Sequence, residues 1–366
     1  MPVDVSVVVG TRPEAIKCAP VVLALRERGL SVRLVASGQH AELLDDALAA
    51  FGLAPDVNLH AMTATPDLTA LTARLLERLG GELRAHPPRM VLVQGDATTC
   101  LSAAMAAFYA GLHCGHIEAG LRSGNLAAPW PEEMNRLLAD RLCTRHYAPT
   151  PGARDALLHE GYSPDSIIVT GQTGVDAALW MAARLGDAPP DVLGGVNGRV
   201  VFVTAHRREN LGGGIEAILR GVIAALDGHP DCTAVLAAHP NPDVRREVER
   251  VRHPRLLVCD PLEYADSIWM LKHAAVIVSD SGGIQEEAPS FGTPVLVARD
   301  VTERPEGLQA GFLRLVGSDE HRVASAMDEV LADSGLRERL KGTPNPYGDG
   351  HAAERIAADV AGLLKS

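Results

Sequence analysis

Short runs of apolar residues alternate along this chain with longer segments in which apolar residues recur at helical spacing. The apolar runs of the first half are 5–10, 32–37, 90–96, 112–120 and 166–171. The helix-spaced segments between them include 13–28, 68–85 and 98–110. The apolar runs are rich in Val and Ile and do not alternate with polar residues, which is typical of parallel strands covered on both faces. The pattern therefore predicts an α/β fold built from βαβ units.

The same pattern restarts near residue 200. The apolar runs of the second half are 200–210, 233–241, 255–260, 275–283 and 294–300. Two prolines and four glycines in 186–199 mark a break between the halves. We therefore expect two Rossmann-like, doubly wound domains facing a cleft, at 1–172 and 173–350. The last predicted helix, 351–366, can pack on either half of the chain. We expect it to pack on the first domain.

Length and charge narrow the class of protein. A chain of 366 residues is long for one domain, and its net charge of −12 disfavours a nucleic-acid partner. No apolar run approaches the length needed to cross a membrane. The start, MPVDVSVVVG, carries no basic leader and is typical of a first strand. We expect a cytoplasmic protein that binds neither nucleic acid nor membrane.

Cofactor and metal motifs are missing from the sequence. The six cysteines are scattered along the chain and form no CxxC pair. This pattern is typical of buried free thiols in a reducing compartment. No HExxH motif occurs, so we predict no catalytic metal. Neither GxGxxG nor GxxxxGK[ST] occurs, which removes support for NAD and ATP. We expect no cofactor.

A glycine turn follows the strand predicted at 275–279. Ser281, Gly282 and Gly283 lie where a helix begins, and a helix N-terminus with free N–H groups attracts phosphate. Glu287 follows Gly283 by four positions and shares its helix face, where a carboxylate can accept hydrogen bonds from a ribose. Together these residues indicate a nucleotide site. The alternative is an ordinary helix N-terminus with favourable acidic charge.

Cations occur at other strand ends. Pro13 suits a first helical position, and Arg12 and Lys17 beside it can reach an anion over the sheet edge. Arg304 stands between two acids in a predicted loop, which is weaker evidence. The alternative for the first pair is a solvated helix start with ordinary charges.

Carboxylates gather at successive connections of the first half. Asp96 and Glu118 end two strands, and Glu132 and Glu133 follow Pro131. Carboxylates crowded at an apolar rim can act as acids or bases. Alternatively, Asp96 caps the helix at 98–110, and Glu132 and Glu133 only begin a helix. Glu118 has no such capping explanation.

A histidine ends the first strand of the second half. His206, followed by two arginines, can contact phosphate or transfer a proton. His239 ends the next strand, but a lone histidine is usually only a polar residue at the sheet rim, and it receives little weight.

Taken together, the motifs resemble those of the bacterial non-hydrolysing UDP-N-acetylglucosamine 2-epimerases. The resemblance runs over nearly the whole chain, in the order typical of that family. The motifs are GTRPEAIK (10–17), GQH (38–40), QGDATT (94–99), GHIEAGLRSG (115–124), PWPEEMNR (129–136), VTAHRREN (203–210), HPNP (239–242), SDSGGIQEEAP (279–289), TERPE (302–306) and NPYGDG (345–350).

The resemblance implies the glycosyltransferase B fold, with the active site between two domains, and a homodimer. It implies reversible conversion of UDP-N-acetylglucosamine to UDP-N-acetylmannosamine, without metal or NAD. The C2 proton would be removed and UDP expelled, leaving a 2-acetamidoglucal to which UDP adds back. Family members also bind a second UDP-N-acetylglucosamine as an activator.

The resemblance also implies roles for single residues. Proton handling would fall to Asp96, Glu118 and Glu132, with His206 facing them from the other domain. Substrate would be bound by Arg12, Lys17, Ser281, Gly282, Gly283, Glu287 and Arg304. The activating site would use Gln39, His40, Arg74, Arg207 and Glu209. Glu286 has no assigned role.

Four positions depart from the family pattern: Asp46, Ala97, Gln172 and Ser267. Asp46 stands where many members have a second glutamine of the activating site, and Ser267 stands where a Phe commonly flanks the uracil. These departures are compatible with looser stacking of the base, or with a substrate that is a modified relative of the usual one. The nearest alternatives are a hydrolysing epimerase and a paralogue acting on a different UDP-2-acetamido sugar. A glycosyltransferase of the same fold and a catalytically silent UDP-sugar sensor are more remote.

Overall fold

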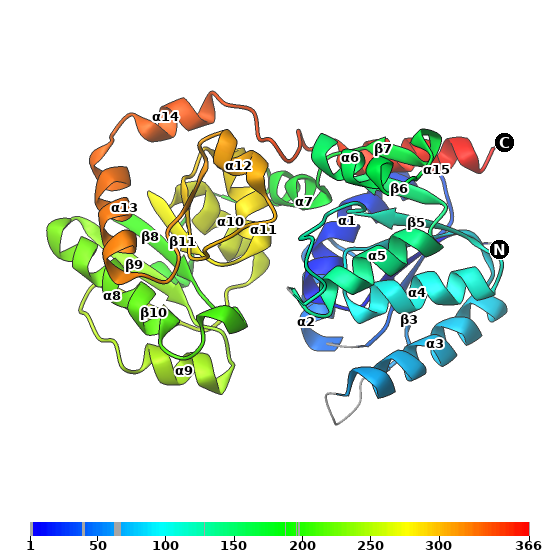
Figure 1. Cartoon of the computed structure of the whole chain (residues 1–366), viewed down its shortest axis with the longest axis horizontal. Helices are drawn as coiled ribbons and strands as arrows, with labels where there is room; N and C mark the ends of the chain where they lie inside the picture. Colours follow the sequence, from blue (N-terminus) through cyan, green and yellow to red (C-terminus); the bar gives the residue numbers. More distant parts are fainter. Residues whose placement is uncertain are drawn as a thin grey trace. The chain divides into compact units, whose positions relative to one another are not determined.

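Two compact units make up the chain. The computed structural model describes residues 3–38, 41–61, 67–127, 129–186, 188–194, 196 and 198–365. One unit comprises Met1–Ala177 and Tyr347–Ser366, and the other comprises Ala178–Pro346. Each unit is built on its own parallel sheet (Figure 1).

The first unit contains a seven-stranded sheet in the order β3-β2-β1-β4-β5-β6-β7. Its strands are β1 Val3–Val9, β2 Val32–Ala36, β3 Val57–Asn58, β4 Pro88–Gln94, β5 His113–Ile117, β6 Arg145–Ala148 and β7 Ile167–Val169. Its helices are α1 Arg12–Glu27, α2 Ala41–Ala49, α3 Leu68–Ala85, α4 Thr98–Tyr109, α5 Glu132–Leu142, α6 Pro151–His159, the 3-10 turn η1 Pro164–Ser166, and α15 Ala352–Leu363. The unit boundary falls within α7, Thr173–Ala182.

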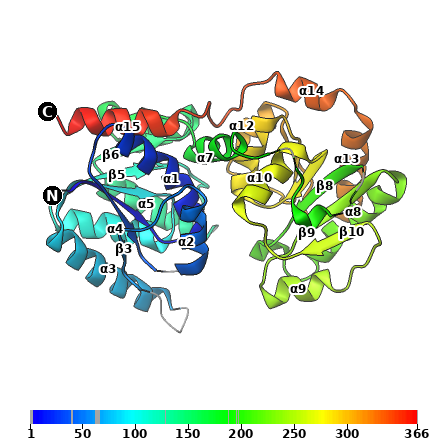
Figure 2. The same ribbon diagram turned by 180° about the vertical axis from the view of Figure 1, so that it is seen from behind.

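Helices cover both faces of this sheet. Helices α3, α4 and α5 pack side by side on one face, and α1, α2 and α15 lie on the other (Figures 1 and 2). Leu75, Leu79 and Ala103 are fully buried in the core under α3 and α4. The C-terminal helix α15 packs against α1, and its Asp359 accepts hydrogen bonds from Arg145 and Tyr147 of β6.

The second unit contains a six-stranded parallel sheet in the order β10-β9-β8-β11-β12-β13. Its strands are β8 Arg199–Thr204, β9 Cys232–Ala237, β10 Leu256–Cys259, β11 Val276–Ser279, β12 Val295–Val297 and β13 Leu313–Leu315. Its helices are α8 Gly214–Gly228, α9 Pro242–Val248, α10 Tyr264–His273, α11 Gly282–Glu287, α12 Pro305–Gln309, α13 Glu320–Ala332 and α14 Leu336–Lys341. Its 3-10 turns are η2 Asp191–Leu193, η3 Arg208–Asn210 and η4 Ala288–Phe291.

This second sheet is also covered on both faces. Helices α8 and α13 pack together over one face, with α9 beside α8, while α10, α11 and α14 meet around η4 on the other (Figures 1 and 2). Ile218, Leu219 and Val323 are fully buried where α8 and α13 meet the sheet.

The prediction of two parallel α/β domains is confirmed by both sheets. Most predicted strands are present, but they end earlier, because their last residues form the loops at the carboxyl edge. The short strands β3, β6 and β13 were not among the predicted runs. Pro13 is the second helical residue and not the first, because α1 begins at Arg12 behind the N-cap Thr11.

Candidate active site

Glu118 is held by two donors at the carboxyl edge of the first sheet. Strands β4 and β5 pair so that Gln94 lies opposite Ile117, which brings the residues that follow each strand together. The buried Glu118 carboxylate accepts a hydrogen bond from Lys17 Nζ at 2.6 Å and another from Gln94 Nε2. The ammonium group favours the ionised carboxylate. Lys17 was expected to contact an anion, and in this structure the anion is Glu118.

Asp96 lies beside Arg136 in the same unit. Arg136 Nη2 is 2.6 Å from Asp96 Oδ2, and Arg136 Nη1 is 3.0 Å from Glu133 Oε2. Burial alone would lower the pKa of Arg136, but the carboxylates of Asp96, Glu118 and Glu133 raise it. Asp96 does not cap a helix, because the N-cap of α4 is Ala97. The capping interpretation of Asp96 is therefore wrong.

Glu132 and Glu133 occupy the first turn of α5 but differ in environment. Glu133 is buried, and its Oε1 accepts hydrogen bonds from the backbone N–H groups of Ser123 at 2.9 Å and Gly124 at 3.0 Å. Glu132 is half-buried, and within the part of the chain that the structure describes its carboxylate makes no hydrogen bond or ion pair. Glu133 thus holds a loop together, while Glu132 remains available to a ligand.

Glu14 is a buried carboxylate that the sequence analysis missed. Its Oε2 accepts hydrogen bonds from the N–H groups of Gly10 and Thr11, each at 2.7 Å, while Oε1 is buried without a partner among the described residues. Burial raises the pKa of Glu14 and outweighs these backbone hydrogen bonds, so that it reaches about 7. The capping box with Thr11 fixes the turn that carries Arg12, and the pattern T-x-x-E in the sequence was the signal for it.

Asp280 holds the loop that follows β8 in the second unit. Its Oδ2 accepts hydrogen bonds from the N–H groups of His206 at 2.8 Å and Arg207 at 2.9 Å, and from Asn210 Nδ2 at 2.9 Å. His206 Nδ1 lies 3.4 Å from Asp280 Oδ1, and 41% of the His206 side chain is exposed. The buried carboxylate therefore fixes the loop and leaves the imidazole accessible.

His239 stacks on His206, although the sequence analysis gave it little weight. The two rings are 5.4 Å apart and inclined by 12°. Burial lowers the pKa of His239, and the charge of His206 lowers it further. Only the pairing of β8 with β9 brings these two loops together.

The glycine turn at 281–283 is shaped by Arg304. A Cβ on Gly282 would lie 2.7 Å from the Arg304 guanidinium, so any larger residue there would displace that group. A Cβ on Gly283 would lie 3.7 Å from Glu287 Oε1, which places Glu287 on the same helix face. Ser281 is the N-cap of α11, and its hydroxyl makes no hydrogen bond within the described residues.

Glu286 is the partner of Arg304. Its Oε1 accepts hydrogen bonds from Arg304 Nε and Nη2, each at 2.7 Å, and its side chain is 1% exposed. The guanidinium of Arg304 is therefore held over Gly282 by a buried carboxylate. Glu286 had no assigned role in the sequence analysis, because its partner lies 18 positions away.

A chain of ion pairs extends from Arg304 to two residues expected in the activating site. Glu303 lies 2.9 Å from Arg304, 2.8 Å from Arg299 and 4.0 Å from Arg207, and Arg299 lies 2.7 Å from Glu209. Burial alone would raise the pKa of Glu303, but Arg304 and Arg299 outweigh it and lower the pKa to about 2. Arg207 and Glu209 are thus connected to Arg304 through buried charges.

The other residues expected in the activating site belong to the first half of the chain. Arg74 lies on α3 of the first unit, and Gln39 and His40 fall outside the described residues. Of the positions that depart from the family pattern, Gln172 is buried, and its N–H donates to Tyr347 O at 2.7 Å. Ser267 lies in α10.

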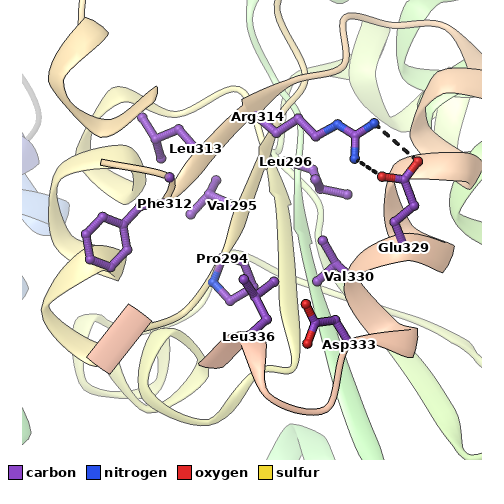
Figure 3. A pocket seen from close by; sticks show the side chains of 11 residues that line it. Pro294, Val295, Leu296, Phe312, Leu313, Arg314, Glu329, Val330, Asp333 and Leu336 are labelled. Carbon is purple, nitrogen blue, oxygen red and sulfur yellow. Dashed lines mark hydrogen bonds and ion pairs between the residues drawn. The ribbon is translucent and has the colours of Figure 1, made fainter. Parts of the chain in front are cut away.

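One pocket of the second unit, of about 230 Å³, contains none of the expected site residues. Figure 3 shows it beside Val295 and Leu313, with the ion pair of Arg314 and Glu329 at its rim. It lies at the amino ends of β12 and β13, whereas the residues described above follow the carboxyl ends of their strands.

Neither a metal site nor a membrane span is found in the described parts of the chain. No group of three or more His, Cys, Asp or Glu side chains in these residues could hold a metal ion. No helix among them is both long enough and apolar enough to cross a bilayer.

The two parallel sheets define the class of protein, an α/β fold of the glycosyltransferase B type. The carboxylates lie at the carboxyl edge of the first unit's sheet, and the glycine turn lies at the carboxyl edge of the second unit's sheet. The family model of UDP-N-acetylglucosamine 2-epimerase matches residues 7–361, so the chain belongs to that family.

Individual relatives agree with this assignment. The chain is 42% identical over 366 residues to UDP-N-acetylglucosamine 2-epimerase of Escherichia coli K12, covering 95% of this chain and 96% of that protein. The crystal structure of UDP-GlcNAc 2-epimerase from Neisseria meningitidis bound to UDP-GlcNAc has a TM-score of 0.92 at 38% identity, with 99% and 100% of the two chains covered. The enzyme from Methanocaldococcus jannaschii, in complex with UDP-GlcNAc and UDP, has a TM-score of 0.83 at 29% identity, with 98% and 99% covered.

Proposed function

We propose that this protein interconverts UDP-N-acetylglucosamine and UDP-N-acetylmannosamine without hydrolysing either, by elimination and re-addition of UDP. The observation that carries the proposal is the placement of Asp96 and Glu118 at the ends of paired strands, each against a cation. Carboxylates at this edge can accept a proton, as removal of the weakly acidic C2 hydrogen requires. Relatives that bind UDP-GlcNAc support the substrate.

The proposed reaction balances without an external reagent. A carboxylate accepts the C2 proton, the C2–H electron pair forms a C1–C2 double bond, and the C1–O bond breaks with its electrons leaving on UDP. The product of this step is 2-acetamidoglucal. Reprotonation of C2 from the opposite face and return of the UDP oxygen to C1 complete the epimerisation. Asp96, Glu118 and Glu132 are the groups proposed to handle the proton.

The second unit is proposed to bind the nucleotide. The free hydroxyl of Ser281 and the backbone of Gly282 and Gly283 would hold the diphosphate, with Arg304 balancing its charge. Glu287 would accept hydrogen bonds from the ribose. The exposed imidazole of His206, fixed by Asp280, would meet the phosphate or move a proton. Arg12 and Lys17 of the first unit would contact the substrate.

Proton and phosphorus NMR in D₂O, with UDP-N-acetylglucosamine, a chelator and no added NAD, tests this function. The expected product is UDP-N-acetylmannosamine carrying deuterium at C2. Accumulation of UDP and free N-acetylmannosamine would instead identify a hydrolysing enzyme. Binding without C2 exchange would favour a sensor or a different UDP-2-acetamido sugar, and sugar transfer to an acceptor would identify a glycosyltransferase.

We also propose that a second UDP-N-acetylglucosamine activates the enzyme. The ion chain Arg207–Glu303–Arg304 supports this, because it links an expected activator residue to an expected phosphate residue through one buried carboxylate. Initial rates should then rise sigmoidally with UDP-N-acetylglucosamine concentration. A hyperbolic curve would remove the activator from the proposal.

We further propose that the protein forms a homodimer. Four large apolar side chains are exposed on the neighbouring helices α4 and α5: Phe108 at 60%, Tyr109 at 73%, Met134 at 40% and Leu138 at 43%. Exposed large apolar side chains on adjoining helices are typical of a subunit interface. Sedimentation equilibrium should give twice the chain mass of 38.7 kDa. Glu substitutions at Phe108 and Leu138 should yield a monomer.

A further inference from the structure

His116 is a fully buried histidine that the proposed reaction does not use. It lies in β5, two positions before Glu118, and its ring is 0% exposed. Nδ1 lies 2.6 Å from Asp140 Oδ1, and Nε2 lies 2.7 Å from the carbonyl oxygen of Gly95. Both ring nitrogens therefore face oxygens, with no solvent between them.

The two contacts define where the protons are. A carbonyl oxygen only accepts hydrogen bonds, so Nε2 must carry a proton to bond with Gly95. Asp140 Oδ2 already accepts from the Gly120 N–H at 3.2 Å and from Arg122 Nη2 at 2.7 Å, which favours the ionised carboxylate. An ionised Asp140 requires a proton on Nδ1 as well. The geometry is that of a doubly protonated imidazolium.

Charges around the ring agree with this state. Burial alone would lower the pKa of His116, but the Asp140 carboxylate outweighs it, and Glu118 adds a smaller effect in the same direction, so that the pKa is raised. The pKa of Asp140 is lowered, because His116 and Arg122 outweigh its burial. His146 Nε2 of β6 donates to the backbone carbonyl oxygen of Asp140 at 2.9 Å, and Cys100 of α4 donates to Gly95 O at 3.2 Å.

We propose that His116 is a positioning residue: a buried imidazolium that fixes the turn at Gly95 and places a positive charge behind Asp96 and Glu118. Gly95 has a φ of 73° and immediately precedes Asp96, so the hydrogen bond to its carbonyl sets the peptide that carries the Asp96 carboxylate. The positive charge would hold both carboxylates in the ionised state that accepts a proton. This inference rests on the proposed function, in which those carboxylates take the C2 proton.

The protonation state can be measured on the wild-type protein without substrate. Nitrogen-15 NMR of histidine-labelled protein at about pH 8, well above the ordinary histidine pKa, should show protons on both ring nitrogens of one residue. The resonances should disappear in the His116→Gln variant, which assigns them. A His116 ring with a proton on only one nitrogen would overturn the proposal, whatever the activity of the enzyme.

Two substitutions then separate charge from hydrogen bonding. His116→Gln can still donate to Gly95 O but is neutral, and His116→Asn can donate only toward Asp140. In the Gln variant we expect the acid limb of the kcat–pH profile to shift to higher pH by about one pH unit, with little change in KM. The Asn variant should in addition lose on the order of 100-fold in kcat, because the Gly95 turn is released. An unchanged profile in the Gln variant would overturn the electrostatic role.

His146→Gln is the matched control. His146 lies directly opposite His116 in the paired strand, is also buried and donates to the backbone oxygen of Asp140, but it makes no hydrogen bond to Gly95. It should change stability and leave the pH profile in place. A shift equal to that of the His116 variant would show a general effect of the network and would overturn the assignment. Absence of epimerisation in the wild type would refute the proposed function but leave the NMR result standing.

Discussion

Lys17 Nζ lies 2.6 Å from Glu118 Oε2, although the two residues are 101 positions apart in the chain. Lys17 is in the second turn of α1, and Glu118 follows β5 with a φ of 73°, a conformation that few residues other than glycine adopt. A non-glycine residue in such a conformation points to a function, because sheet register and ion pair together must hold it there. The buried ion pair fixes the Glu118 carboxylate at the carboxyl edge of the first sheet.

Replacing Glu118 by Gln should abolish most turnover. Gln cannot accept a proton, while it still accepts a hydrogen bond from Lys17, so the fold should be kept. We expect kcat to fall about 10²- to 10⁴-fold. The measurement is deuterium exchange at C2 in D₂O, with UDP affinity determined by calorimetry. A near-normal exchange rate would remove Glu118 from the mechanism, and loss of UDP binding would indicate misfolding.

Asp96→Asn is expected to have a similar effect on kcat, since Asn retains an oxygen for Arg136 but loses the charge. The fall should again be about 10²- to 10⁴-fold at unchanged UDP affinity. Asp45→Asn is a suitable control, because Asp45 is exposed on α2 of the same unit. Equal losses in the two variants would contradict a specific role of Asp96.

Glu286→Gln should weaken nucleotide binding without removing the C2 chemistry. The substitution takes away the charge that holds the Arg304 guanidinium over Gly282. Hydrogen bonds to charged groups contribute about 1.5–3 kcal/mol, so the Kd for UDP should rise about tenfold or more. Titration calorimetry measures it. Glu329→Gln breaks an exposed Glu–Arg pair in the same unit and should leave the Kd unchanged.

The buried Glu14 should make folding stability depend on pH near neutrality. Its pKa is raised from 4.5 to about 7, so the folded state binds this proton more tightly than the unfolded state. Its contribution is complete below pH 4.5 and is lost as the pH rises through 7, a change on the order of 3 kcal/mol. Urea unfolding at a series of pH values measures it. Glu14→Gln should flatten the curve in this window, and exposed Glu77→Gln should not.

Asp359 should fasten the C-terminal helix α15 to the first sheet. Its carboxylate accepts hydrogen bonds from Arg145 Nε at 2.8 Å and from the hydroxyl of the buried Tyr147 at 3.0 Å. Asp359→Ala leaves a guanidinium and a phenol without this partner, and we expect a loss of about 2–3 kcal/mol in unfolding free energy. Asp155→Ala removes an exposed ion pair with Arg154 and should cost under about 1 kcal/mol. Equal costs would contradict the fastening role.

Local patterns in the sequence predicted much of the fold. Val-rich runs and helix-spaced segments placed most strands and helices, because side-chain periodicity depends only on neighbouring residues. The same local spacing placed Glu287 on the face of Gly283. The strands β3 and β6 were missed, because their sequences, VN and RHYA, contain no run of apolar residues.

Partners across the chain were decided by the tertiary structure. The sequence showed two adjacent carboxylates at 286–287 and at 132–133, but only the folded chain distinguishes their environments. In the structure Glu286 pairs with Arg304, and Glu133 pairs with Arg136. Likewise, only the register of β4 against β5 places His116 under Gly95. The sequence alone determined which residue types reach the sheet edges, because strand and turn patterns are local. The structure decided which charges meet, because those contacts depend on strand order and register over many positions.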